Sequence, residues 1–130
     1  MSDTMQYIDS EQAVGEILKN GKLTLLYFTA DWCGPCQQIK PVVAQIHEKA
    51  PNLNVYLVDV DKAQALAQKF EIKSMPTFFL FHQTDLLLRF SGADAEKLGM
   101  IVQVCTRLEQ KLMTLKPRTV PQVLQPRKLE

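Results

Sequence analysis

The stretch LLYFTADWCGPCQQIK, residues 25–40, joins an apolar run, a short turn and the start of a helix. Residues 22–29, KLTLLYFT, are almost continuously apolar, which is typical of a central strand that is buried on both faces of an α/β sheet. Pro35 suits the first turn of a helix, where its missing N–H costs nothing. Cys33 and Cys36 therefore lie where a buried strand passes into a helix.

The two cysteines have the spacing and the location of a reactive pair. Cys33 meets the unpaired N–H groups and the positive end of the helix dipole, so we expect the pKa of its thiol to lie below the free value of about 8.5. One helical turn brings Cys36 within disulfide reach but deeper in the protein. The pattern predicts that Cys33 attacks a disulfide and that Cys36 resolves the mixed disulfide. Gly34 lets the backbone approach a partner closely, and Pro35 stiffens the turn.

Zinc binding and a purely structural disulfide are the alternatives for this cysteine pair. A zinc site needs two further ligands, and the remaining candidates, Cys105, His47 and His82, fall on separate predicted elements. We therefore expect no metal. A disulfide that closes so small a ring removes little entropy from the unfolded chain, so a structural role is equally poor. Cys105 lies on the apolar stripe of the last helix and fits as a small buried hydrophobe, with a regulatory thiol as the alternative.

The rest of the chain alternates strands and helices in the order β-α-β-α-β-α-β-β-α. Strands are expected at 5–8, 22–29, 52–60, 76–82 and 86–92, and helices after Asp9 or Ser10, at about 36–50 with a kink at Pro41, at 62–70, and after Asp94. Alternation early in the chain indicates parallel pairing, and the short loop QTD between the last two strands demands an antiparallel hairpin. The fold class is therefore α/β: a mixed, twisted five-stranded sheet with three parallel-type strands, a C-terminal hairpin and four flanking helices.

The 130 residues suffice for one domain, which we place at residues 1–115. Residues 116–130 hold four Lys or Arg residues, one Glu and three prolines without periodicity, and they predict a basic tail that is extended or disordered. The net charge of +1 gives no case for nucleic acid or a charged membrane surface. The start of the chain has no apolar signal segment, and no apolar run reaches the roughly 18 residues of a membrane span. The expected location is the cytoplasm, with the nucleus and the mitochondrion left open.

The motif WCGPC at residues 32–36 resembles the active site of the thioredoxin family. VDVDK at 58–62, SMPTF at 74–78 and FSGADAEKL at 90–98 follow in that family's order and spacing, so the resemblance covers about residues 5–113. It implies the thioredoxin fold, with Cys33 as the nucleophile, Cys36 as the resolving thiol and a cis bond before Pro76. It also implies a shallow groove that receives an extended client segment and is lined by Trp32, Met75, Pro76, Gly92 and Ala93.

The resemblance implies a dithiol–disulfide oxidoreductase that reduces protein disulfides and needs no bound cofactor. Electrons would come from an NADPH-dependent thioredoxin reductase, and clients would be of the peroxiredoxin or ribonucleotide reductase type. Monomer is the expected state. The alternative is a thioredoxin-fold adaptor that binds partners through the groove between Trp32 and Pro76 with little turnover. The intact thiol pair argues against an adaptor, and the Gly-Pro dipeptide resembles that of reductases rather than oxidases.

Two positions depart from the family pattern. Tyr27 stands where the family usually has a buried aspartate that relays a proton for the resolving thiol, and Leu57 stands where a lysine is usual. We therefore expect a resolving step that is slower or differently dependent on pH, with solvent taking the proton. Tyr27, Asp59 and Asp61 are candidate proton-transfer helpers. A phenol is a poor base at neutral pH, however, and the simplest role for Tyr27 is packing in the core.

Overall fold

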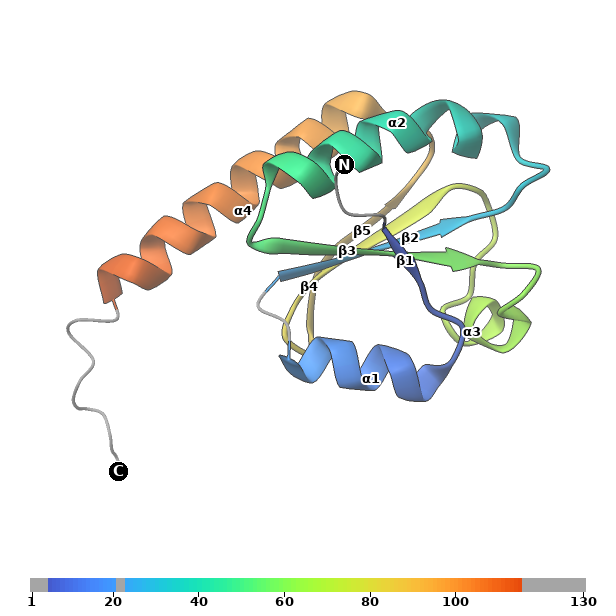
Figure 1. The fold of residues 1–130 in the computed structure, drawn as a ribbon, viewed down its shortest axis with the longest axis horizontal. Coiled ribbons are helices and arrows are strands. Elements are labelled where there is room, and N and C mark those ends of the chain that lie inside the picture. Colours follow the sequence, from blue (N-terminus) through green and yellow to red (C-terminus); the bar gives the residue numbers. More distant parts are fainter. Residues whose placement is uncertain (1–4, 21–22, 116–130) are drawn as a thin grey trace.

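The computed structural model describes residues 5–20 and 23–115, so the predicted tail at 116–130 lies outside the described residues. The elements along the chain (Figure 1) are β1 (Gln6–Tyr7), α1 (Glu11–Asn20), β2 (Leu23–Thr29), α2 (Gly34–Lys49), β3 (Leu53–Asp59), α3 (Gln64–Lys69), β4 (Thr77–His82), β5 (Asp85–Ser91) and α4 (Ala95–Leu115). Their order is the predicted one, and most boundaries move by one or two residues.

The strands form one mixed sheet in the order β1-β3-β2-β4-β5. β3 pairs in parallel with both β1 and β2, β4 runs antiparallel to β2, and β5 completes the hairpin with β4. The predicted combination of parallel strands and a C-terminal hairpin is confirmed. All seven residues of β2 are buried, because this central strand has neighbours on both edges and helices over both faces.

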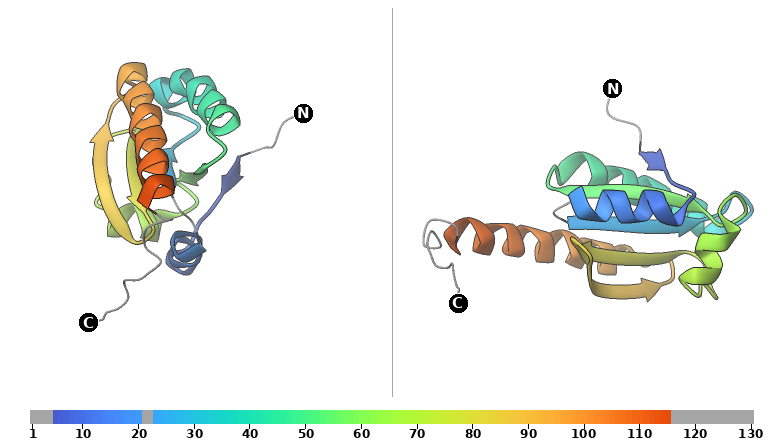
Figure 2. Two further views of the ribbon diagram at one scale, coloured as in Figure 1. Left: turned by 90° about the vertical axis from the view of Figure 1, so that its left-hand side faces the viewer. Right: turned by 90° about the horizontal axis from the view of Figure 1, so that it is seen from below.

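Helices cover both faces of the sheet, α2 and α4 on one side and α1 and α3 on the other (Figure 1). Alternate residues of β2 serve the two cores: Leu25 and Tyr27 pack toward α2 and α4, whereas Leu26 and Phe28 pack toward α1 and α3. α4 continues past the ends of the strands, as Figure 2 shows from two further sides. Within the described part of the chain, no helix has the length and apolar character that crossing a membrane requires.

Side-chain caps fix where three of the helices begin. The Ser10 hydroxyl accepts a hydrogen bond from the Ala13 N–H at 3.1 Å, and the Asp94 carboxylate accepts from two N–H groups in the first turn of α4. Cys33 is the N-cap of α2, and Pro35 occupies its first turn as predicted. Pro41 lies inside α2, which runs through it to Lys49; the kink expected there stays a prediction.

A ladder of three aromatic rings crosses the sheet beneath α2 and α4. Tyr27 on β2, Phe78 on β4 and Phe90 on β5 are direct cross-strand neighbours. Tyr27 and Phe78 stack with ring centroids 5.0 Å apart, and Phe78 stacks on Phe90 at the same separation. Such cross-strand aromatic pairs stabilise a sheet beyond the area they bury, so this ladder fixes the hairpin against the central strand.

We predict that Phe78→Ala lowers the free energy of unfolding by about 3–5 kcal/mol, because it leaves a cavity at the centre of the ladder. Urea unfolding of the oxidised protein measures the change. The control is Leu87→Ala on the same hairpin, where the side chain is 43% exposed and truncation costs roughly 0.5 kcal/mol. Equal losses in the two variants would contradict the central role of the ladder.

Candidate active site

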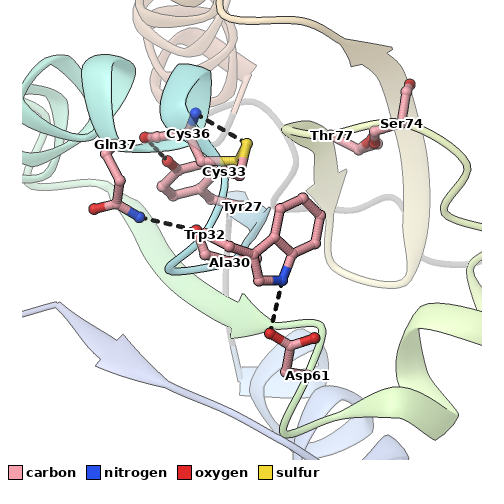
Figure 3. The surroundings of a disulfide bond; sticks show 9 residues. All are labelled: Tyr27, Ala30, Trp32, Cys33, Cys36, Gln37, Asp61, Ser74 and Thr77. Atoms are coloured by element: carbon pink, nitrogen blue, oxygen red, sulfur yellow. Dashed lines mark hydrogen bonds between the residues drawn. A yellow bond between two sulfur atoms is a disulfide. The ribbon is translucent and has the colours of Figure 1, made fainter.

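Cys33 and Cys36 form a disulfide at the N-terminal end of α2, with their Cα atoms 5.2 Å apart. The N–H of Cys36 donates to the Cys33 sulfur at 3.2 Å (Figure 3). Cys33 keeps 4% of its surface exposed, whereas Cys36 keeps none. The Cys33 sulfur thus receives an N–H from the first turn of the helix, and a partner can reach Cys33 but not Cys36.

Backbone and side-chain hydrogen bonds fasten this turn to the end of β2. The carbonyl of Ala30 accepts from the N–H of Cys33 at 3.2 Å and from the side-chain amide of Gln37 at 2.9 Å. The N–H of Gln37 donates to the carbonyl of Cys33 at 3.1 Å. Gln37 was not among the predicted site residues. The contact forms because the first turn of α2 places the Gln37 side chain above the end of β2. A polar residue in a predicted helix gives no sign in the sequence of such a contact.

The segment before β4 lies against the cysteine pair. Met75 packs against the small buried cluster that contains both cysteines, and the Met75–Pro76 peptide bond is cis as predicted. The N–H of Gly92 donates to the carbonyl of Pro76 at 2.8 Å, which brings the end of β5 to the same place. Gly92 has a φ of +105°, a conformation that favours glycine, and Ala93 after it is exposed. The structure therefore brings Met75, Pro76 and Gly92 together; their role as a client groove stays a prediction.

Trp32 is an exposed aromatic beside the disulfide, with 67% of its surface accessible. Its indole N–H donates to the Asp61 carboxylate at 2.8 Å, across to the loop after β3 (Figure 3). Asp59 is buried, and its carboxylate accepts from the N–H groups of Asp61 and Lys62 at 2.9 and 3.4 Å. Both aspartates thus have partners other than the cysteines, and a part for them in proton transfer stays a prediction.

Tyr27 lies directly under the first turn of α2, fully buried and stacked on Phe78. Its hydroxyl donates to the carbonyl of Cys36 at 2.5 Å (Figure 3). Leu57 is its register partner on β3, so both departures from the family pattern lie side by side. Burial raises the pKa of Tyr27 above its ordinary value, which keeps the phenol protonated and able to donate.

The other candidate ligands of the sequence lie on separate elements: His47 on α2, His82 on β4 and the buried Cys105 on α4. Among residues 5–20 and 23–115, no three His, Cys, Asp or Glu side chains gather closely enough to hold a metal ion. A cavity of about 360 Å³ is lined by Tyr7, Ile8, Asp9, Asp31, Asp59 and Lys62. Its lining includes neither Cys33 nor Cys36.

Comparisons with known proteins agree with this geometry. The family model described as Thioredoxin matches residues 5–104. Thioredoxin of Callithrix jacchus is 43% identical over 96 residues, which are 72% of this chain and 91% of that protein, and thioredoxin of Homo sapiens is 42% identical over the same length and shares.

Solved thioredoxin structures have the same fold. That of Malassezia sympodialis superposes with a TM-score of 0.72 and 32% identity over 78% of this chain and 90% of its own. That of Fasciola hepatica gives a TM-score of 0.73 and 31% identity over 76% and 97%. With its cysteine pair at the N-terminus of α2, the chain belongs to the thioredoxin family and is a dithiol–disulfide oxidoreductase.

Proposed function

We propose that the chain reduces the disulfides of client proteins, with Cys33 as the nucleophile and Cys36 as the resolving thiol. One observation carries this assignment of roles. Of the two bonded cysteines, Cys33 caps the helix and retains exposed surface, whereas Cys36 is fully enclosed. A client sulfur can therefore approach Cys33 along the helix N-terminus, where a thiolate is stabilised.

The reaction has two thiol–disulfide exchanges. First, the Cys33 thiolate attacks one client sulfur, the client disulfide breaks, and the released client thiolate takes a proton from solvent. Then Cys36 gives up its proton to solvent and attacks the Cys33 sulfur, which breaks the mixed disulfide and releases the second client thiolate, and this thiolate also takes a proton from solvent. The client gains two electrons and two protons, and the chain ends in the disulfide form that the structure holds.

The client is proposed to bind as an extended segment in a groove lined by Trp32, Met75, Pro76, Gly92 and Ala93. Three observations support this surface: the contact of Met75 with the cysteine cluster, the Gly92–Pro76 hydrogen bond, and the exposed indole of Trp32 held by Asp61. The backbone at Met75 would pair with the client as an added strand. Side-chain contacts in the groove would then supply specificity.

Family membership and the sequence support a proposal for the wider setting. An NADPH-dependent thioredoxin reductase would return electrons to the disulfide, and clients would include peroxiredoxin-type and ribonucleotide reductase-type enzymes. No bound cofactor beyond the redox-active disulfide is needed. The chain would act as a monomer in the cytoplasm, through a catalytic domain at residues 1–115 with residues 116–130 appended.

The wild type should catalyse the reduction of insulin by dithiothreitol, followed as turbidity, and Cys33→Ser should give only the uncatalysed rate because the attacking sulfur is gone. An uncatalysed rate from both proteins would contradict the reductase assignment. That result would favour the alternative function, an adaptor that binds partners through the same groove.

Cys36→Ser should accumulate a mixed disulfide with a client protein, because the resolving sulfur is missing while the nucleophile remains. Peptide mapping by mass spectrometry under non-reducing conditions should place the client on Cys33. Cys33→Ser should trap no client. A client attached to Cys36 in that variant would reverse the assigned roles.

Met75→Ala should lower kcat/KM for insulin reduction about fivefold, since it removes an apolar contact from the proposed groove. Met100→Ala is the matched control, because Met100 is 61% exposed on α4 outside that groove. Its kcat/KM should equal that of the wild type. Equal activity of both variants would argue against Met75 as part of the client surface.

A further inference from the structure

We propose that Tyr27 is a positioning residue whose hydroxyl holds the Cys36–Gln37 peptide and so orients the Cys36 thiol for the resolving step. The inference rests on the proposed function, because it takes Cys36 as the resolving thiol. Tyr27 is a neutral hydrogen-bond donor at the position where the family usually has a buried acid. In this chain the residue would therefore act through geometry rather than through proton transfer.

A continuous line of hydrogen bonds leads from Tyr27 to both cysteines. The Tyr27 hydroxyl donates to the Cys36 carbonyl at 2.5 Å, and the N–H of the same peptide group, that of Gln37, donates to the Cys33 carbonyl at 3.1 Å. Donation to the carbonyl polarises the peptide and strengthens the bond made by its N–H. The Tyr27 hydroxyl thus restrains the backbone of both Cys36 and Cys33.

The tether starts from a rigid part of the molecule. Tyr27 belongs to the central strand β2, is fully buried, and stacks on Phe78, which in turn stacks on Phe90. A ring held in this way leaves its hydroxyl little freedom to move away from the helix. The Tyr27 hydroxyl therefore holds the first turn of α2 in a fixed position relative to the sheet. This tether would keep the Cys36 sulfur aimed at Cys33 after the disulfide opens.

The described surroundings of Tyr27 favour its protonated form over a role as a base. β3 and β4 present the apolar side chains of Leu57 and Phe78 at the register positions beside it. Among the described residues, the titratable groups that the contacts place near it include the cysteines of α2 and the phenol of Tyr7 on β1. Burial raises the pKa of Tyr27, so its proton stays on the hydroxyl and is directed at the Cys36 carbonyl.

The test follows both thiol reactions in one stopped-flow experiment with dithiobis(nitrobenzoate). Attack by Cys33 releases the first nitrothiobenzoate anion and leaves the other bonded to Cys33. Attack by Cys36 on the Cys33 sulfur then forms the intramolecular disulfide and releases the second anion. A Cys105→Ala background confines the signal to the active-site thiols. The proteins compared are this background, Tyr27→Phe, which keeps the ring and removes only the hydroxyl, and Tyr56→Phe, the same change on β3.

Tyr27→Phe should leave the first phase unchanged and slow the second about three- to tenfold at every pH, as expected from the loss of one hydrogen bond. The pH midpoint of the second phase should not move. Hydrogen exchange of the Gln37 backbone N–H, measured by NMR, should become faster in the same variant. Tyr56→Phe should match the background protein in all three measurements.

Two outcomes would overturn the tether. An unchanged second phase and Gln37 exchange in Tyr27→Phe would leave Tyr27 with a packing role alone. A changed shape of the pH profile would make Tyr27 a proton carrier instead. Failure of the underlying roles is recognised separately with the single-cysteine variants: Cys33→Ser would then release its one anion as fast as the background protein releases the first, and Cys36→Ser would be slow, whatever Tyr27→Phe does.

Discussion

The attachment of the α2 N-terminus to the carboxyl end of β2 is the constraint on which the active site depends. β2 is buried along its whole length, so its end is a fixed point in the molecule. Hydrogen bonds from Cys33 and Gln37 to the Ala30 carbonyl hold the helix start at that point. Because Cys33 caps this helix, its sulfur accepts the N–H of Cys36 in the first turn of α2.

The hairpin of β4 and β5 supplies the second half of the site. Antiparallel pairing of β4 with β2 places Met75 and Pro76 at the same end of the sheet as the cysteines. The Gly92–Pro76 hydrogen bond brings the end of β5 to the same place. The stacked rings of Tyr27, Phe78 and Phe90 join these strands below the helices. The packing of the sheet therefore also determines where Met75, Pro76 and Gly92 lie relative to the cysteines.

The sequence predicted well wherever local chemistry determines structure. The apolar run around Leu25 identified the central strand, Asp94 marked the start of α4, and the spacing of Cys33 and Cys36 predicted their disulfide. The sequence did not predict the contacts between residues that are far apart along the chain. The Trp32 indole meets Asp61, and the Tyr27 hydroxyl meets the Cys36 carbonyl, only because of the three-dimensional path of the chain. A polar atom on a buried side chain needs a partner, but its sequence position does not name one.

The most direct test of the account is the thiolate absorbance of the reduced protein as a function of pH, with Cys105→Ala as the background. Cys36→Ser reports the ionisation of Cys33, and Cys33→Ser reports that of Cys36. We predict that Cys33 ionises at the lower pH, because the helix N-terminus stabilises its thiolate whereas Cys36 is fully buried. Ionisation of Cys36 at the lower pH would contradict this prediction, since the enclosed sulfur would then be the one present as thiolate near neutral pH.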